Sequence, residues 1–405
     1  MGRFVIDGGR PLFGSVRVSG SKNGALPILF ATLLTKDISV IDNFPDIGDT
    51  RAALRILSHL GAQYTLTGST LTVDTRSIAY RPVPTEYTSP LRGSTYLLGS
   101  SLGAFGLAEI PEYGGCNFAK RPIDLHLDAI RHFGGEINGH SIDGAHLHPA
   151  TLRLALPSVG ATVNSLLLAS CIEGESILCG VACEPHVDCL IDFLISMGAK
   201  ISKQHNCLCV IGGKLHGGRI RILGDMIEAG TYLCAGIISG GGVEARGFCP
   251  VELSSMLGLL SDSGVSVELL PDGAAVSGAP RGHITVTAEP YPGFPTDLQP
   301  IIAPLLALCG GSIRDRIFPD RFGYLAELSS FGLRYDRVCE GVILHPSRLI
   351  SGRGRACDLR GGVALLLAAL CAEGESTVDD AQTVLRGYSG LCNKLTDLGA
   401  NVKIL

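Results

Sequence analysis

A glycine-rich loop carries a side chain that could act as a nucleophile or proton donor. Cys116 follows Gly114 and Gly115, and the cations Lys120 and Arg121 stand a few residues beyond it. Successive glycines indicate an exposed loop, and nearby cations lower the pKa of a thiol from its ordinary value of about 8.5. The sequence therefore marks Cys116 as a candidate reactive thiol. The alternative is an ordinary surface turn whose cysteine has no chemical role, since it would have the same residue pattern.

A lysine at an expected helix start is a second candidate. A phosphate-binding P-loop needs four residues between its glycines and a Ser or Thr after the lysine. Here five residues separate Gly14 from Gly20, and Asn23 follows Lys22, so that motif is absent. Because the positive end of a helix dipole repels a cation, Lys22 suggests a bound anion at this point. A solvated lysine is the alternative.

An acidic residue in a rigid loop is a third candidate. Two prolines, Pro292 and Pro295, and the intervening Gly293 precede Thr296 and Asp297. Thr296 or Asp297 is well placed to cap the helix that follows. A carboxylate fixed at a helix start could also serve as a general base.

Three arginines stand beside or near glycines at expected element boundaries. They are Arg92, Arg360 and Arg386. Each is compatible with a surface position or with an anion ligand, because the guanidinium fork binds carboxylate and phosphate through two parallel hydrogen bonds.

The sequence predicts no metal or organic cofactor. Cys207 and Cys209 alternate along an expected strand, and His126 and His132 lack the spacing of zinc ligands. The run 240–242 of three glycines is too short for a dinucleotide fingerprint.

A repeated unit must position these candidates. A helix that ends in glycine and leads into a strand recurs six times, with the glycines roughly 64 to 73 residues apart. Glycine just past a helix end commonly adopts the left-handed conformation that releases the chain. A second helix lies between successive copies and is apolar nearly all round, as in Ser165–Cys171 and Ala364–Cys371, so we expect it to be buried. The six glycines are Gly61, Gly134, Gly198, Gly264, Gly332 and Gly399.

The repeat count predicts an α/β fold of two domains with three units each. Each unit should hold two helices and about four strands. One domain is expected to be continuous over 22–223, and the other to join 1–21 with 224–405. The strand-like segment Gly14–Ser19 is expected to complete the last unit. Two crossings between the domains would leave a cleft able to close by hinge motion.

Composition narrows the class of protein. Hydrophobic residues make up 46% and charged residues 18% of the 405, which suits large buried cores and excludes a disordered or fibrous chain. A net charge of -5 argues against a general nucleic-acid binder. The longest apolar runs are shorter than the ~20 residues of a membrane span. The 14 cysteines lie mostly in apolar runs, and no signal peptide precedes them, so we expect a reducing cytoplasm.

Together the motifs resemble one family over essentially the whole chain. The segments Ser21–Asn23, Gly114–Cys116, Arg121–His126 and Phe294–Asp297 occur in it on six helix–glycine–strand units. The chain resembles the UDP-N-acetylglucosamine 1-carboxyvinyltransferases, which are enolpyruvyl transferases that open peptidoglycan precursor synthesis. The resemblance implies two inside-out α/β barrel domains of three units each, with an active-site cleft between them.

The resemblance also implies a reaction. Enolpyruvyl passes from phosphoenolpyruvate to the 3′-hydroxyl of UDP-N-acetylglucosamine by addition and elimination, with release of phosphate. Cys116 matches a loop cysteine that acts as a general acid, can form a substrate adduct and is alkylated by fosfomycin. Asp297 matches the base that removes the 3′-hydroxyl proton, and Lys22 and Arg386 complete the implied catalytic set.

The implied substrate ligands form two sets, and no nucleic acid, membrane, cofactor or obligate protein partner is implied. The phosphoenolpyruvate ligands are Lys22, Arg92, Cys116, Arg121, Arg360 and Arg386. The nucleotide-sugar ligands are Asn23, Arg92, Arg121, Pro122, Ile123, Asp124, Leu125, Ser158, Val159, Gly160, Asp297 and Ile317. Five further residues also fall on family motifs, without an assigned role: Asp49, Glu184, Asp225, Glu228 and Arg321.

Two departures from the family pattern leave alternatives open. Leu156 stands where members usually carry a lysine on the nucleotide diphosphate, and Phe118 with Ala119 replaces an aliphatic residue and a glycine in the cysteine loop. A paralogue for another nucleotide or nucleotide sugar is one alternative, and a retired ligand-binding regulator is another. Retention of the four implied catalytic residues opposes the second. The related shikimate-pathway enzymes share the implied fold, but Gly114–Cys116 and Arg121–Leu125 favour the nucleotide-sugar enzymes.

Overall fold

The computed structural model describes residues 2–110, 114 and 122–405. These residues divide into two compact units. The internal unit contains 20–110, 114 and 122–223, and the terminal unit contains 2–19 and 224–405. Each unit has its own cluster of buried apolar side chains, so each has its own core.

The internal unit alternates helices with short strands. Its helices are α1 (Lys22–Ala31), η1 (Thr32–Leu34), α2 (Gly48–His59), α3 (Thr85–Thr88), η2 (Arg92–Tyr96), α4 (Leu97–Phe105), α5 (Asp124–His132), α6 (Val159–Cys171) and α7 (Pro185–Ser196). Its strands are β3 (Ile38–Asp42), β4 (Gln63–Thr67), β5 (Thr70–Asp74), β6 (Leu107–Glu109), β7 (Glu136–Asn138), β8 (Ser141–Asp143), β9 (Thr151–Arg153), β10 (Gly174–Cys179), β11 (Lys200–Gln204), β12 (Cys207–Gly212) and β13 (Arg219–Arg221).

The terminal unit also alternates helices with short strands. Its helices are α8 (Met226–Ile238), η3 (Pro250–Leu253), α9 (Ser254–Asp262), η4 (Thr296–Leu298), α10 (Gln299–Cys309), α11 (Tyr324–Leu328), η5 (Ser329–Phe331), α12 (Leu359–Cys371), α13 (Ala381–Leu385) and α14 (Leu391–Asp397). Its strands are β1 (Arg3–Gly8), β2 (Phe13–Arg17), β14 (Gly242–Arg246), β15 (Ser266–Leu270), β16 (Gly273–Ser277), β17 (Ile284–Ala288), β18 (Gly311–Asp315), β19 (Arg334–Val338), β20 (Gly341–His345), β21 (Arg353–Arg355), β22 (Gly374–Asp379) and β23 (Asn401–Ile404).

The strands of the described residues form six small sheets, three in each unit. Five sheets have four strands, and the sheet β6-β8-β7 has three. Most pair an antiparallel hairpin with a parallel edge strand, as in the order β11-β12-β10-β9, where β9 lies parallel to β10. The predicted mixed α/β class with about four strands per unit is therefore confirmed.

The six glycines of the sequence repeat all adopt the left-handed conformation. Their φ angles lie between 86° and 108°, a region that side chains rarely enter. Each lies one or two residues beyond a helix and releases the chain toward a strand. The repeat identified in the sequence is therefore confirmed as a repeat of structure.

One helix in each repeat is buried along most of its length. In the internal unit these inner helices are α1, α4 and α6, and in the terminal unit they are α8, α10 and α12. Their sequences are apolar on every face, so water can be excluded from the whole circumference. Side chains at the N-terminal ends of four of them, Ser21, Ser158, Asp225 and Asp358, accept hydrogen bonds from the first free amides of the helix.

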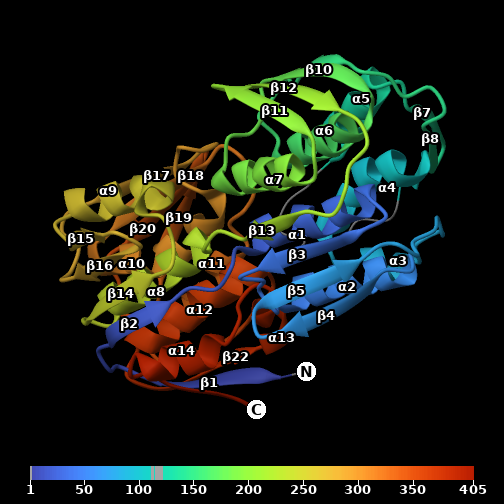
Figure 1. Cartoon of the computed structure of the whole chain (residues 1–405). Helices are drawn as coiled ribbons and strands as arrows, with labels where there is room; N and C mark the ends of the chain where they lie inside the picture. The colour runs from blue at the N-terminus through green and yellow to red at the C-terminus, as the bar shows by residue number, and fades with distance from the viewer. Residues whose placement is uncertain (1, 111–113, 115–121) are drawn as a thin grey trace. The chain divides into compact units, whose positions relative to one another are not determined.

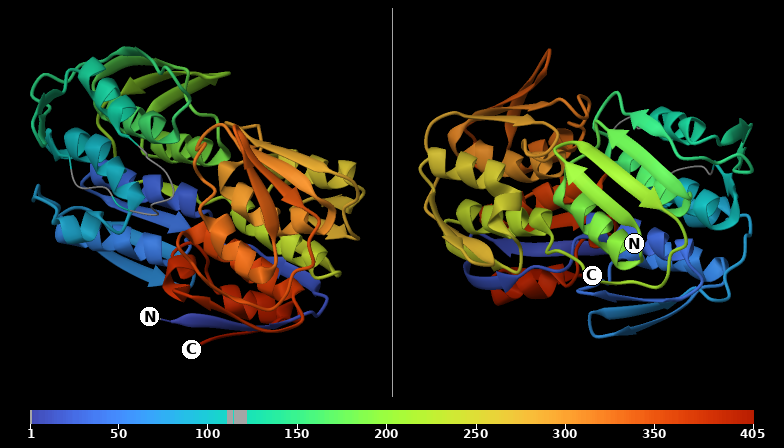
Figure 2. Two further views of the ribbon diagram at one scale, coloured as in Figure 1. Left: turned by 180° about the vertical axis from the view of Figure 1, so that it is seen from behind. Right: turned by 45° about the horizontal axis from the view of Figure 1, so that its top comes forward.

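The N-terminal strands join sheets that the sequence did not predict. The segment that becomes β2 was expected to complete the last unit, but β2 pairs in parallel with β14, in the fourth repeat. The last unit is completed by β1, which lies between β22 and β23. The expectation was wrong because both N-terminal segments have strand-like patterns, and the pattern of one strand does not specify its partner. Figure 1 shows β1 beside β22, and both views of Figure 2 show the two chain ends side by side.

A disulfide joins Cys179 at the end of β10 to Cys207 at the start of β12. The two residues are direct partners in the antiparallel register, with their Cα atoms 4.1 Å apart. The sequence analysis did not predict this bond. Cys234 behaves as the small hydrophobe it was expected to be, because burial raises the pKa of its thiol to about 12. Within the described part of the chain, no helix is long and apolar enough to cross a membrane.

Two glycines of the fourth repeat test the role of the left-handed turn. We expect Gly264→Ala to lower the free energy of unfolding by about 1 kcal/mol, because φ is 89° there. Gly258→Ala, inside the exposed face of α9 with open space around it, should raise it by about 0.5–1 kcal/mol. Urea unfolding of both variants checks this; equal effects would contradict the assignment of Gly264 as a helix-release residue.

Candidate active site

Lys22 begins α1 in the internal unit, where Ser21 caps the helix by accepting from the Gly24 amide. The Lys22 ammonium lies 3.4 Å from the Asp49 carboxylate at the start of α2, and both side chains are largely buried. The carboxylate offsets part of the repulsion between the lysine and the helix dipole. An anion bound at Lys22, as expected from the sequence, stays a prediction.

The first turns of α5 and α6 carry the predicted nucleotide-sugar residues. Ser158 caps α6 through its hydroxyl, which accepts from the Ala161 amide at 3.3 Å. Asp124 opens α5, preceded by Pro122 and Ile123. The Arg92 guanidinium, at the start of η2, donates to the Pro122 carbonyl at 3.5 Å. η2 packs against α1 and α6, and α5 packs against α6, so the structure brings these segments together at one end of the inner helices.

Two predicted residues, Cys116 and Arg121, lie outside the described residues. Nothing is therefore added to the sequence interpretation of the cysteine loop.

In the terminal unit, Asp297 lies between two arginines whose side chains are only 3% exposed. Arg321 donates to one carboxylate oxygen at 2.9 Å, and Arg360 donates to the other at 3.2 Å and 3.3 Å. Two buried guanidinium groups favour the ionised carboxylate. Asp297 is therefore held as a negatively charged group on η4, immediately before α10.

Further hydrogen bonds from Arg321, Thr296 and Asp315 fix this cluster. Arg321 donates to the carbonyl and hydroxyl of Thr296, and that hydroxyl donates to Asp315 at 2.5 Å. The other Asp315 oxygen accepts from the amides of Ile317 and Phe318. These bonds orient Asp297 and also set the backbone of Ile317, a predicted nucleotide-sugar residue.

The capping role expected for Thr296 and Asp297 was wrong. Neither side chain caps α10: Thr296 bonds to Asp315 and Asp297 pairs with the arginines. The sequence could not show this, because the competing partners stand 19 to 63 residues further along the chain. The capping that does occur nearby is by Asp358, whose carboxylate accepts from the amides of Arg360 and Gly361.

Arg360 is fixed from three sides. Its backbone is capped by Asp358, its guanidinium pairs with Asp297, and it stacks over the Tyr388 ring with 5.3 Å from Cζ to the ring centre. Burial alone would lower the pKa of Arg360, but the Tyr388 phenol and the Asp297 carboxylate outweigh it and raise that pKa. Arg386 lies at the C-terminal end of α13, two residues before Tyr388.

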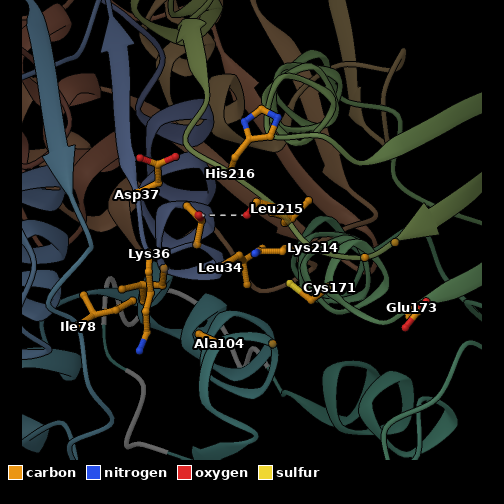
Figure 3. A pocket seen from close by; sticks show the side chains of 15 residues that line it. Leu34, Lys36, Asp37, Ile78, Ala104, Cys171, Glu173, Lys214, Leu215 and His216 are labelled. Atoms are coloured by element: carbon orange, nitrogen blue, oxygen red, sulfur yellow. Dashed lines mark hydrogen bonds between the residues drawn. The ribbon is translucent and has the colours of Figure 1, made fainter.

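A cavity of about 910 Å³ lies elsewhere in the internal unit. Its lining comes from the C-terminal ends of η1, α4 and α6 and from segment 212–216, and it includes no predicted site residue. Figure 3 shows Lys36, Asp37, Glu173, Lys214 and His216 around it. The thirteen residues of α6 rise by roughly 18 Å, so this cavity and the Ser158 turn lie at opposite ends of that helix.

Sequence reasoning missed three supporting residues, Asp315, Asp358 and Asn164. Asp358 had a signal, because an acid two residues before Arg360 and Gly361 fits an N-cap. Asp315 stands between two arginines and Asn164 lies in an apolar helix, both without a motif, and only the tertiary fold brings them to their partners. Among the residues described, no group of three or more His, Cys, Asp or Glu side chains is arranged to hold a metal ion.

The ion pairs of Asp297 predict that removing its charge costs more unfolding free energy than removing the charge of an exposed aspartate. Asp297→Asn should lower the free energy of unfolding by on the order of 3 kcal/mol, because it leaves two buried cations with less compensating charge. Asp379→Asn is the matched control, since its partner Arg353 is 69% exposed, and should cost under about 1 kcal/mol. Denaturant titration measures both. Similar losses in the two variants would show that the Asp297 cluster is not an electrostatically coupled buried group.

Comparisons with known proteins agree with the motifs. Residues 6–395 match the profile of the family described as EPSP synthase (3-phosphoshikimate 1-carboxyvinyltransferase). The chain is 36% identical over 423 residues to UDP-N-acetylglucosamine 1-carboxyvinyltransferase 2 of Streptococcus pyogenes, with 100% of both chains covered. It is 38% identical over 421 residues to UDP-N-acetylglucosamine 1-carboxyvinyltransferase 3 of Caldanaerobacter subterraneus, with 99% of both covered.

A solved structure supports the fold. The enolpyruvyl transferase NikO from Streptomyces tendae superposes with a TM-score of 0.88 at 27% identity, covering 100% of this chain and 98% of that one. A family match over nearly the whole chain and full-length relatives above 30% identity lead to one conclusion: this chain belongs to the enolpyruvyl transferase family.

Proposed function

We propose that this chain transfers the enolpyruvyl group of phosphoenolpyruvate to the 3′-hydroxyl of UDP-N-acetylglucosamine and releases phosphate. The observation that carries the proposal is the Asp297 carboxylate, held ionised between Arg321 and Arg360 at the start of α10. An ionised carboxylate in a fixed position is what removal of a hydroxyl proton requires. Full-length relatives named for this activity support the choice of substrates.

The proposed roles follow from charge. Phosphoenolpyruvate carries a phosphate and a carboxylate, and Lys22, Arg92, Arg121, Arg360 and Arg386 supply cations for both groups. Because Arg360 already contacts Asp297, it would link the phosphoenolpyruvate site to the base. The first turns of α5 and α6, with Asn23, would hold the nucleotide sugar.

The chemistry then proceeds by addition and elimination. Asp297 accepts the 3′-hydroxyl proton as the sugar oxygen bonds to C2 of phosphoenolpyruvate, and Cys116 gives a proton to the methylene carbon C3. Loss of a proton from C3 restores the double bond as the C2–O bond to phosphate breaks, so phosphate leaves. The proposal requires residues of both units to act on one pair of substrates.

The proposal extends to architecture. Each unit would be an inside-out α/β barrel, with three sheets outside three buried helices, and the domains would divide at 22–223 against 1–21 with 224–405. Six sheets and six inner helices among the described residues support this reading.

Phosphate release from phosphoenolpyruvate, measured with and without UDP-N-acetylglucosamine, tests the function. Release should depend on the acceptor, and Asp297→Asn should lower kcat by roughly 10²–10⁴-fold, the usual effect of losing a general base. Asp379→Asn should leave kcat unchanged. Absence of acceptor-dependent release from the wild-type protein would refute the proposal. Full activity in Cys116→Ser would refute the proton-donor role alone.

One competing function is supported by an observation: transfer of enolpyruvyl to an acceptor other than UDP-N-acetylglucosamine. Leu156 is 65% exposed, two residues before the α6 cap, where the resembled family usually carries a lysine. An apolar side chain there gives the diphosphate no cation, so another nucleotide or nucleotide sugar remains the second candidate.

Restoring the cation separates the two acceptor hypotheses. If the acceptor is UDP-N-acetylglucosamine, Leu156→Lys should lower its KM about tenfold, since a charge-assisted hydrogen bond contributes about 1.5–3 kcal/mol. Leu269→Lys is the control, because that leucine is 66% exposed on β15, away from the predicted residues. An unchanged or raised KM in Leu156→Lys would favour another acceptor, to be sought in a panel of uridine nucleotides.

A further inference from the structure

His126 lies in the first turn of α5 and is 5% exposed, although its neighbour Asp124 on the same turn is exposed. Its Nδ1 atom lies 2.7 Å from the side-chain nitrogen Nδ2 of Asn164, in the middle of α6. This is a buried polar contact between the two helices whose first turns carry the predicted nucleotide-sugar residues.

The hydrogen bonds of Asn164 assign the proton on His126. The Gly99 amide can only donate, and it donates to Asn164 Oδ1 at 2.8 Å, which fixes the orientation of the side-chain amide. One hydrogen of Nδ2 goes to the Thr95 carbonyl at 3.1 Å, and the other points to His126 Nδ1. Nδ1 must therefore accept, so the single ring proton of the neutral imidazole is on Nε2.

The opposite edge of the ring packs against the first turn of α6. A Cβ atom placed on Gly160 would lie 2.5 Å from Cε1 and 2.7 Å from Nε2 of His126. No side chain fits at Gly160 while the imidazole is in place. The ring therefore sets the distance between the start of α5 and the start of α6, and it explains physically why residue 160 is glycine.

The charges that face His126 keep the imidazole neutral. Burial, and after it the Arg92 guanidinium on η2, lower the pKa of His126, while Asp124 on its own helix raises it; the net effect is a pKa of about 4. Asn164 on α6 is uncharged, but its Nδ2 group is a hydrogen-bond donor. A proton on His126 Nδ1 would place two donors against one another. A charged imidazole would add a second cation beside Arg92 and break the bond to Asn164.

We infer that His126 is a positioning residue of the acceptor pocket: through its acceptor bond to Asn164 and its packing on Gly160, it fixes the first turns of α5 and α6 relative to one another. The inference rests on the proposed function for the identity of the acceptor. His126 acts through Asp124, Leu125 and Ser158–Gly160, which are the predicted ligands. The sequence analysis considered His126 only as a zinc ligand and excluded it by its spacing from His132.

The tautomer is read directly by NMR of the wild-type protein labelled with ¹⁵N-histidine. At neutral pH the His126 ring should carry its proton on Nε2, and it should stay neutral as the pH is lowered toward about 4. Asn164→Asp replaces the donor with an acceptor, so the variant should move a proton to Nδ1. A wild-type ring protonated on Nδ1 at neutral pH would overturn the inference, whatever the activity of the protein.

Kinetics separate positioning from general structure. His126→Ala should raise the KM for UDP-N-acetylglucosamine at least tenfold, while kcat changes less than threefold. His126→Asn, whose amide oxygen can replace Nδ1 as an acceptor, should recover part of the loss. His132→Ala, on the exposed last turn of α5, is the control and should match the wild type. An unchanged acceptor KM in His126→Ala, or a fall confined to kcat, would refute the positioning role.

The pH dependence of stability provides a third readout that needs no substrate. Because the folded-state pKa of His126 lies below its ordinary value of 6.5, its neutral form stabilises the protein fully above pH 6.5, and that stabilisation is lost as the pH falls toward 4. His126→Asn should remove this part of the decline, whereas His132→Ala should not. If the wild type shows no acceptor-dependent phosphate release, the proposed function fails while the tautomer and stability results still judge the role of His126 in the fold.

Discussion

The burial of six apolar helices is the constraint on which the rest of this structure depends. A helix that is enclosed on every side can carry a polar side chain only where that group finds a hydrogen-bond partner, as Asn164 does within α6, because an unpaired polar group inside the core costs free energy. The N-terminal ends also present free amide groups and the positive pole of the dipole. Ser21, Ser158, Asp225 and Asp358 cap four of these ends, and the predicted site residues stand beside them. The architecture thereby concentrates chemistry at one end of each helix group.

The two units use this end differently. In the internal unit the first turns combine one lysine, one arginine and a neutral histidine, an arrangement suited to an anionic nucleotide. In the terminal unit Asp297 lies between two guanidinium groups that are nearly inaccessible to water. Because charges interact strongly where water is excluded, this carboxylate is kept ionised and fixed in direction. In the proposed function, Arg360 would both bind the anionic substrate and keep the proposed base Asp297 ionised.

The sequence predicts what depends on local pattern and misses what depends on pairing. The six glycines, the apolar helices and the α/β class follow from composition and spacing, and all are confirmed by the φ angles and the sheets. The partner of β2 was predicted wrongly, and the Cys179–Cys207 bond was not predicted, because both depend on which strands become neighbours. Thr296 and Asp297 were expected to cap α10, but distant arginines and Asp315 compete more strongly for the same oxygens. Family motifs predict Asp297 and Arg360 as site residues, whereas only the fold connects His126 to Asn164.

Enolpyruvyl transfer by addition and elimination, as proposed, requires protonation of the methylene carbon of phosphoenolpyruvate. Running the reaction in deuterium oxide and analysing the enolpyruvyl product by mass spectrometry and NMR tests this most directly. We expect deuterium on the vinyl carbon of the product, introduced only when the acceptor is present. Product formed without any deuterium at that carbon would contradict the addition step and the role assigned to Cys116.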